Sequence, residues 1–106
     1  MSILAAFIAP HPPLIVPQIG KGEEETIRET SESFQKIAEK IALLKPDTIV
    51  LASPHSVMYS DYLHISPGST ATGDFGKFGA RDVRITVAYD TEFRRSLIDL
   101  INQNDI

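Results

Sequence analysis

Two short apolar runs without polar alternation constrain the fold of this chain most strongly. They are ILAAFIA, residues 3–9, and TIVLA, residues 48–52. A strand without polar alternation is typical of a sheet that is covered on both faces. Prolines follow both runs within a few residues and end them, because proline removes a ladder donor. The sequence therefore predicts two buried strands, which suit a parallel sheet better than an open antiparallel one.

The segment between these runs has the pattern of one amphipathic helix. Three consecutive glutamates, beginning at Glu23, stand in its first turn, where negative charge complements the helix dipole. Its apolar positions fall on one stripe, namely Ile27, Phe34, Ile37, Ala38, Ile41 and Leu44. Lys45 is a favourable cation in the last turn, and Pro46 ends the helix. Strand, helix and strand in this order predict a right-handed βαβ unit, which joins parallel strands.

The remainder of the chain departs from this pattern. Residues 61–66 and 82–89 alternate as half-exposed strands do, and a glycine-rich loop lies between them. Asp90 or Thr91 is predicted to cap a last helix. The expected fold is α/β, a three-layer α/β/α arrangement with a mixed, partly parallel sheet, in one domain over residues 1–106. Because so few strands make a thin sheet, we expect an incomplete, N-terminal part of a larger domain.

Composition excludes several kinds of site and partner. The chain contains no cysteine, which excludes disulfides, thiolate metal sites and a cysteine nucleophile within it. Its formal net charge of -4 is opposite to the clustered positive charge of a nucleic-acid-binding surface. The N-terminal apolar run is too short to span a membrane and lacks the basic flank of a signal peptide. We therefore expect a cytoplasmic protein with neither a nucleic-acid nor a membrane partner.

A histidine follows each of the two apolar runs. His11 lies in PHPP after the first run, and His55 lies in SPHS after the second. The carboxyl ends of parallel strands meet at one edge of the sheet, where open α/β sheets hold their ligands. Adjacent strands are about 4.8 Å apart, so both imidazoles could reach one metal ion. Either histidine alone would be read as a loop cap, but the pair at equivalent points predicts a shared metal site. His64 lies within YLHIS and is instead predicted to be a half-exposed strand residue.

Two imidazoles suit Fe(II), Zn(II) or Cu(II), and a non-haem Fe(II) centre usually adds one carboxylate. Asp47 precedes its strand, at the edge opposite to His55, and Asp61 opens the next strand. Asp74 lies in the glycine-rich GDFGKFG segment, where an aspartate is typically a turn former. The third ligand is therefore expected outside this chain. That segment also lacks the phosphate-loop pattern.

Two aromatic residues of the glycine-rich segment have alternative interpretations. Phe75 and Phe78 are predicted to pack over the edge of the sheet. Alternatively, they wall an apolar pocket beside the histidines.

Three segments together resemble the N-terminal half of class III extradiol ring-cleavage dioxygenases, the LigB-like family: AFIAPHPPLIVPQIGKGEE, LKPDTIVLASPHS and GDFGKFGA. They are closest to the bacterial branch grouped with Memo-like proteins and radical SAM partners. The resemblance implies an α/β/α fold, a mononuclear non-haem Fe(II) and the O2-dependent opening of a catechol-type ring. By motif match, His11 and His55 take the two histidine-ligand roles. The family's glutamate ligand and catalytic acid/base histidine lie in its C-terminal half, so no residue of this chain takes those roles.

Two other functions stay open. Memo-like relatives keep much of the fold, and their dioxygenase activity is not assured, so the chain is alternatively a non-catalytic binding or regulatory module. A zinc-dependent hydrolase is the third option, because Zn(II) accepts the same imidazoles. The isolated 106-residue chain is expected to lack catalysis and to form a homo-oligomer through exposed strand edges.

Overall fold

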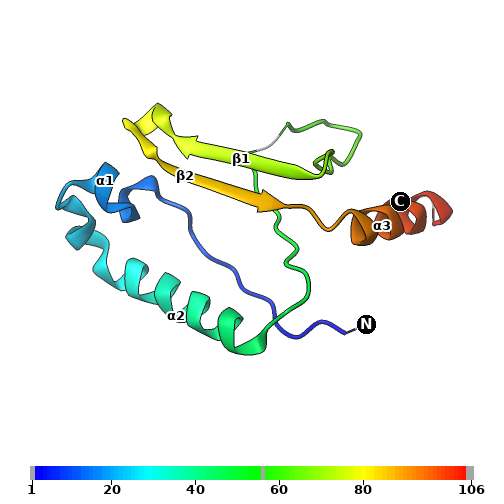
Figure 1. The fold of residues 1–106 in the computed structure, drawn as a ribbon, viewed down its shortest axis with the longest axis horizontal. Coiled ribbons are helices and arrows are strands. Elements are labelled where there is room, and N and C mark those ends of the chain that lie inside the picture. The colour runs from blue at the N-terminus through cyan, green and yellow to red at the C-terminus, as the bar shows by residue number, and fades with distance from the viewer. Residues whose placement is uncertain (1, 56, 105–106) are drawn as a thin grey trace. The chain divides into compact units, whose positions relative to one another are not determined.

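The computed structural model describes residues 2–55 and 57–104, which form helices and one two-stranded sheet (Figure 1). The α-helices are α1, Pro17–Gly20; α2, Arg28–Leu44; and α3, Thr91–Gln103. The strands are β1, Thr70–Phe75, and β2, Ala80–Ala88. Short 3-10 helices cover Pro13–Ile15, Glu23–Ile27 and Gly76–Phe78. The chain divides into two compact units, Met1–Ile49 with Asp74–Arg84 and Val50–Gly73 with Ile85–Ile106, and each is described by itself.

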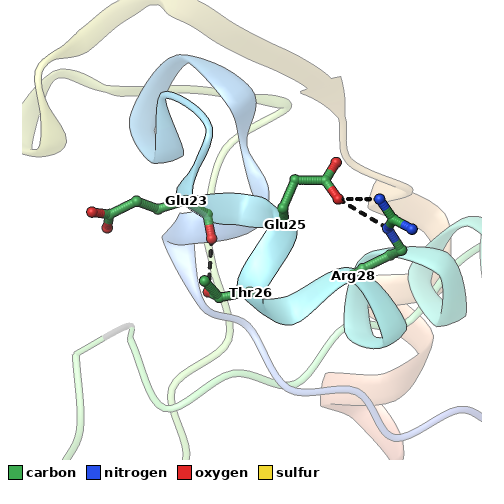
Figure 2. Close-up of polar contacts among 4 residues, drawn as sticks. All are labelled: Glu23, Glu25, Thr26 and Arg28. Atoms are coloured by element: carbon green, nitrogen blue, oxygen red, sulfur yellow. Dashed lines mark hydrogen bonds and ion pairs between the residues drawn. The ribbon is translucent and has the colours of Figure 1, made fainter.

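The helix predicted after the glutamate run is confirmed, with a 3-10 turn ahead of α2. The Thr26 hydroxyl donates to the Glu23 carbonyl at 2.7 Å (Figure 2). The Arg28 guanidinium binds the Glu25 carboxylate through both Nε, at 2.9 Å, and Nη2 (Figure 2). The hydrogen bond to Glu25, and then its charge, raise the pKa of Arg28. The Arg28 side chain thus joins the first turn of α2 to the 3-10 turn that precedes it.

The stripe and the end of α2 also follow the sequence pattern. Phe34, Ile37 and Ile41 are half-buried on the predicted stripe, whereas its members Ala38 and Leu44 are exposed. Lys45 ends the helix in the left-handed conformation, with φ of 47°, and its N–H donates to the Ile41 carbonyl at 3.1 Å. Pro46 follows, as expected, because the left-handed residue has already turned the chain out of the helix.

Strands β1 and β2 form an antiparallel hairpin (Figure 1). The hydroxyls of Thr72 and Thr86 lie 2.9 Å apart across the two strands. The Asp74 carboxylate lies 3.6 Å from the Arg84 guanidinium. β2 was predicted, but β1 lies within the segment that was predicted to be a loop. The cross-strand contacts therefore outweigh the weak strand propensity of the glycine-containing TATGDF sequence.

The last helix, α3, is confirmed together with its cap. The Asp90 carboxylate accepts a hydrogen bond from the Phe93 N–H at 2.9 Å. The Arg94 guanidinium donates to the carbonyl of Ser66 at 3.1 Å and to that of Gly68. These bonds attach the first turn of α3 to the segment that leads into β1.

Three segments that were predicted as strands have no regular secondary structure: residues 3–9, 48–52 and 61–66. A strand exists only where a neighbour takes its backbone hydrogen bonds, and the sheet of the described residues consists of β1 and β2. Apolar side chains of the first two segments are accordingly exposed, for example Ile8 at 102% and Leu51 at 85%. Helices together with a sheet agree with the α/β class. The three-layer arrangement, the partly parallel sheet and the single domain stay predictions.

Candidate metal-binding histidines

His11 lies in the N-terminal segment without regular secondary structure, and Pro12 separates it from the Pro13–Ile15 turn. Its side chain is exposed, and it lies in the unit that contains α2. Pro10 and Pro12 flank it, and each proline fixes its own φ near -65°. The backbone at His11 is therefore restrained before any ligand binds, which lowers the entropy that binding would cost.

His55 lies in a short turn of the other unit. Its side chain is exposed, and its backbone N–H donates to the Ser53 hydroxyl at 3.2 Å. Pro54 stands between these two residues. The serine hydroxyl and the proline ring together hold the turn that presents His55.

The two histidines belong to different units, so their binding of one shared ion stays a prediction. Within residues 2–55 and 57–104, no group of three or more histidine and acidic side chains could hold a metal ion. The chemistry of the donors nevertheless fits part of a non-haem iron site, because imidazole nitrogens are good Fe(II) ligands.

Of the three acidic candidates, Asp74 has the position that the sequence indicated, whereas the strands predicted beside Asp47 and Asp61 are absent from the described residues. One Asp74 carboxylate oxygen accepts from the Gly76 N–H at 2.7 Å, and the other faces Arg84 at 3.6 Å. Asp74 is therefore a turn former, as its glycine-rich context predicted. Asp47 and Asp61 are exposed, and both lie in bends outside the helices and strands.

The remaining sequence candidates lie outside any described site. His64 is exposed, but the prediction that it lies in a strand is wrong, because residues 61–66 have no ladder. Phe75 and Phe78 contact each other at the closed end of the hairpin, with ring centroids 6.5 Å apart and planes tilted by 47°. Their alternative role as walls of a pocket beside the histidines stays a prediction.

An open hollow lies between the N-terminal segment and α2, within a single unit. Its volume is 290 Å³, and it is lined by Ile8, Ala9, Pro10, Glu29, Thr30, Ser33, Phe34 and Ile37. Pro10, which lines the hollow, directly precedes His11, so one predicted ligand is adjacent to the lining in the sequence. Five of the lining residues are apolar, and Glu29, Thr30 and Ser33 add one carboxylate and two hydroxyls. A mostly apolar wall with a few polar groups is the usual lining of a small-molecule site. The sequence analysis missed the polar members, Glu29, Thr30 and Ser33. Thr30 lies four residues before Phe34, and Ser33 four before Ile37, a spacing that places side chains beside each other on a helix.

Comparison with known proteins assigns the chain to a family. Residues 5–106 match the family described as the catalytic LigB subunit of aromatic ring-opening dioxygenase, and the chain belongs to that family. A curated relative, Protein CA_C1420 of Clostridium acetobutylicum, is 35% identical over 100 residues. The aligned part covers 94% of this chain and 21% of that protein, so the chain spans about a fifth of the relative's length. No solved structure matches the chain.

In the described residues, no helix has the length and apolar character needed to cross a membrane.

Proposed function

We propose that this chain supplies two histidine ligands, His11 and His55, to a cytoplasmic non-haem Fe(II) dioxygenase that opens a catechol-type ring with O2. The observation that carries the proposal is the family match over residues 5–106, which includes both histidine motifs. Two imidazoles and one carboxylate are the usual ligands of such an iron, and they leave positions open for substrate and O2. The carboxylate and the catalytic base are proposed to come from outside this chain.

The chain's own residues prepare the two ligands for binding. When bound, Fe(II) would act as a template that holds the substrate oxygens and O2 together. Pro10 and Pro12 restrain the backbone at His11, and Ser53 holds the turn at His55. Both imidazoles are exposed, so metal binding requires no prior opening of a packed core. The hollow beside Pro10 is proposed to receive the apolar face of the aromatic ring.

Anaerobic Fe(II) titration of the full-length protein, followed by catechol turnover under O2, tests this proposal. His11→Ala and His55→Ala are each expected to lose iron and turnover together. His64→Ala is the matched control, because this exposed histidine lies outside both motifs. The proposal fails if both motif variants bind iron and turn over as the control does.

The same preparation separates the alternatives that the resemblance leaves open. A Memo-like binding or regulatory module would retain metal binding through both histidines but would not turn over catechols. A zinc-dependent hydrolase would be purified with Zn(II), which accepts the same ligands. Catechol turnover therefore separates the dioxygenase from the module, and metal analysis of protein purified without added metal tests the zinc-dependent hydrolase.

A further inference from the structure

We propose that the outer edge of β2 pairs antiparallel with the same edge of a second copy of this chain, centred on Val83. The pairing joins two hairpins into a four-stranded sheet. It is independent of the proposed iron chemistry, because it rests on the residues of the β1–β2 hairpin and not on either histidine.

The hairpin register shows which backbone groups of β2 lie on its outer edge. The Tyr89 N–H donates to the Ser69 carbonyl at 2.9 Å, so these opposite residues form a hydrogen-bonded pair. Such pairs alternate with non-hydrogen-bonded pairs along an antiparallel ladder. Counting back along β2, Val83 directs its backbone groups toward β1, whereas Asp82 and Arg84 direct theirs outward. No third strand pairs with this edge within the residues that the structure describes.

The charges on this edge favour one register. With Val83 at the two-fold axis, Asp82 lies opposite Arg84 of the second copy, and Arg84 lies opposite the second copy's Asp82. Opposite charges in such pairs stabilise a ladder, and like charges destabilise it. If the two-fold axis passed through Asp82, two aspartates would lie opposite each other. If it passed through Arg84, two arginines would lie opposite each other. The edge is therefore complementary to itself in the register centred on Val83.

Both faces of the resulting sheet are consistent with this register. On the polar face, Arg84 would lie between its own Asp74, at 3.6 Å, and Asp82 of the second copy. The Arg84 side chain is 64% exposed, so it is open to this second partner. On the other face, Phe75 lies opposite Val83 within each hairpin, so the two copies would form a continuous apolar row. Charges on an edge strand usually prevent pairing, but opposite charges two residues apart instead select a matching copy.

Cysteine cross-linking of the full-length protein tests the register directly. Opposite residues in a non-hydrogen-bonded pair have Cα atoms about 4.5 Å apart, a separation that a disulfide can bridge. The chain contains no cysteine of its own. Val83→Cys is expected to form a disulfide-linked dimer at least about tenfold faster than Ile85→Cys, whose thiols would not lie opposite each other. Equal rates, or no cross-linked dimer, would overturn the proposal.

Sedimentation equilibrium tests the charge pairing without relying on one variant. Asp82→Arg and Arg84→Glu are each expected to raise the dimer Kd at least about tenfold, because like charges then meet twice. Asp99→Arg makes the same charge change as Asp82→Arg on an exposed position of α3 and is expected to leave the Kd unchanged. A mixture of the Asp82→Arg and Arg84→Glu proteins is expected to dimerise again, because opposite charges then meet at both pairs. A mixture that stays monomeric, or an Asp99→Arg protein that dissociates equally, contradicts the proposal.

Discussion

Lys45 carries a backbone conformation that its side chain disfavours. Its φ of 47° lies in the left-handed region, where a Cβ atom crowds the following carbonyl oxygen. Glycine is the usual residue at this position after a helix, because it has no Cβ. The favourable charge of a lysine beside the helix C-terminus therefore accompanies an unfavourable backbone geometry.

We predict that Lys45→Gly stabilises the protein by about 0.5–1 kcal/mol, because it removes that crowding at a left-handed position. Lys40→Gly is the matched control. It removes the same charge inside α2, where glycine is expected to cost about 1 kcal/mol. Urea denaturation of the full-length protein measures both, and destabilisation of similar size in the two variants would contradict the prediction.

His11 and His55 have similar local surroundings. Each lies next to at least one proline, and each is exposed outside the helices and strands. The proline motifs showed from the sequence alone that these histidines lie where chain direction changes. The sequence could not show whether the imidazoles meet, because that depends on pairing between segments far apart in the chain.

The two amphipathic helices are the elements that the sequence predicted best. Their signals are local: the glutamates ahead of α2, Pro46 after its end, and Asp90 at the start of α3. A cap or a helical stripe involves residues within one or two turns, so it is readable without knowledge of the rest of the fold.

We predict that Asp90→Ala destabilises α3 by about 1 kcal/mol, because the Phe93 N–H loses its hydrogen-bond acceptor. Asp99→Ala is the control, since it removes the same charge from the middle of α3. The two variants are compared by thermal unfolding. Equal melting temperatures would show that the Asp90 cap makes no contribution.

Strands were predicted less well than helices, for a physical reason. TATGDF contains glycine and aspartate and reads as a loop, yet it forms β1 because Thr72 and Asp74 have partners on β2. Residues 3–9 form the continuous apolar run of a buried strand but have no ladder in the described structure. The local sequence alone therefore gave the wrong prediction for both segments, because a strand depends on the neighbouring strand as well as on its own sequence.

Considered as a whole, the molecule exposes much apolar surface. Its accessible surface is 9307 Å². Two separate compact halves of an 11.7 kDa chain would expose about 7,100 Å² together. Ala80 is the buried apolar residue within the described ranges. So large an excess is comparable to the area of an obligate interface, about 2,000 Å² or more.

We therefore predict that the isolated 106-residue chain binds the dye ANS strongly and unfolds without a cooperative transition, since it has little core. The full-length protein is expected to bind less dye and to unfold cooperatively. Fluorescence titration and urea denaturation measure the two properties. A sharp two-state transition with weak dye binding in the isolated chain would contradict this prediction.

The central claim is that His11 and His55 bind the same ion. A double-mutant cycle of anaerobic Fe(II) affinity in the full-length protein tests it most directly. Each single alanine substitution is expected to weaken binding by more than about 100-fold, beyond the loss typical of an outer-shell partner. The double variant is expected to be little worse than either single one, because one missing ligand already destroys a shared site. Losses that multiply independently in the double variant, or unchanged affinity in both single variants, would contradict the claim.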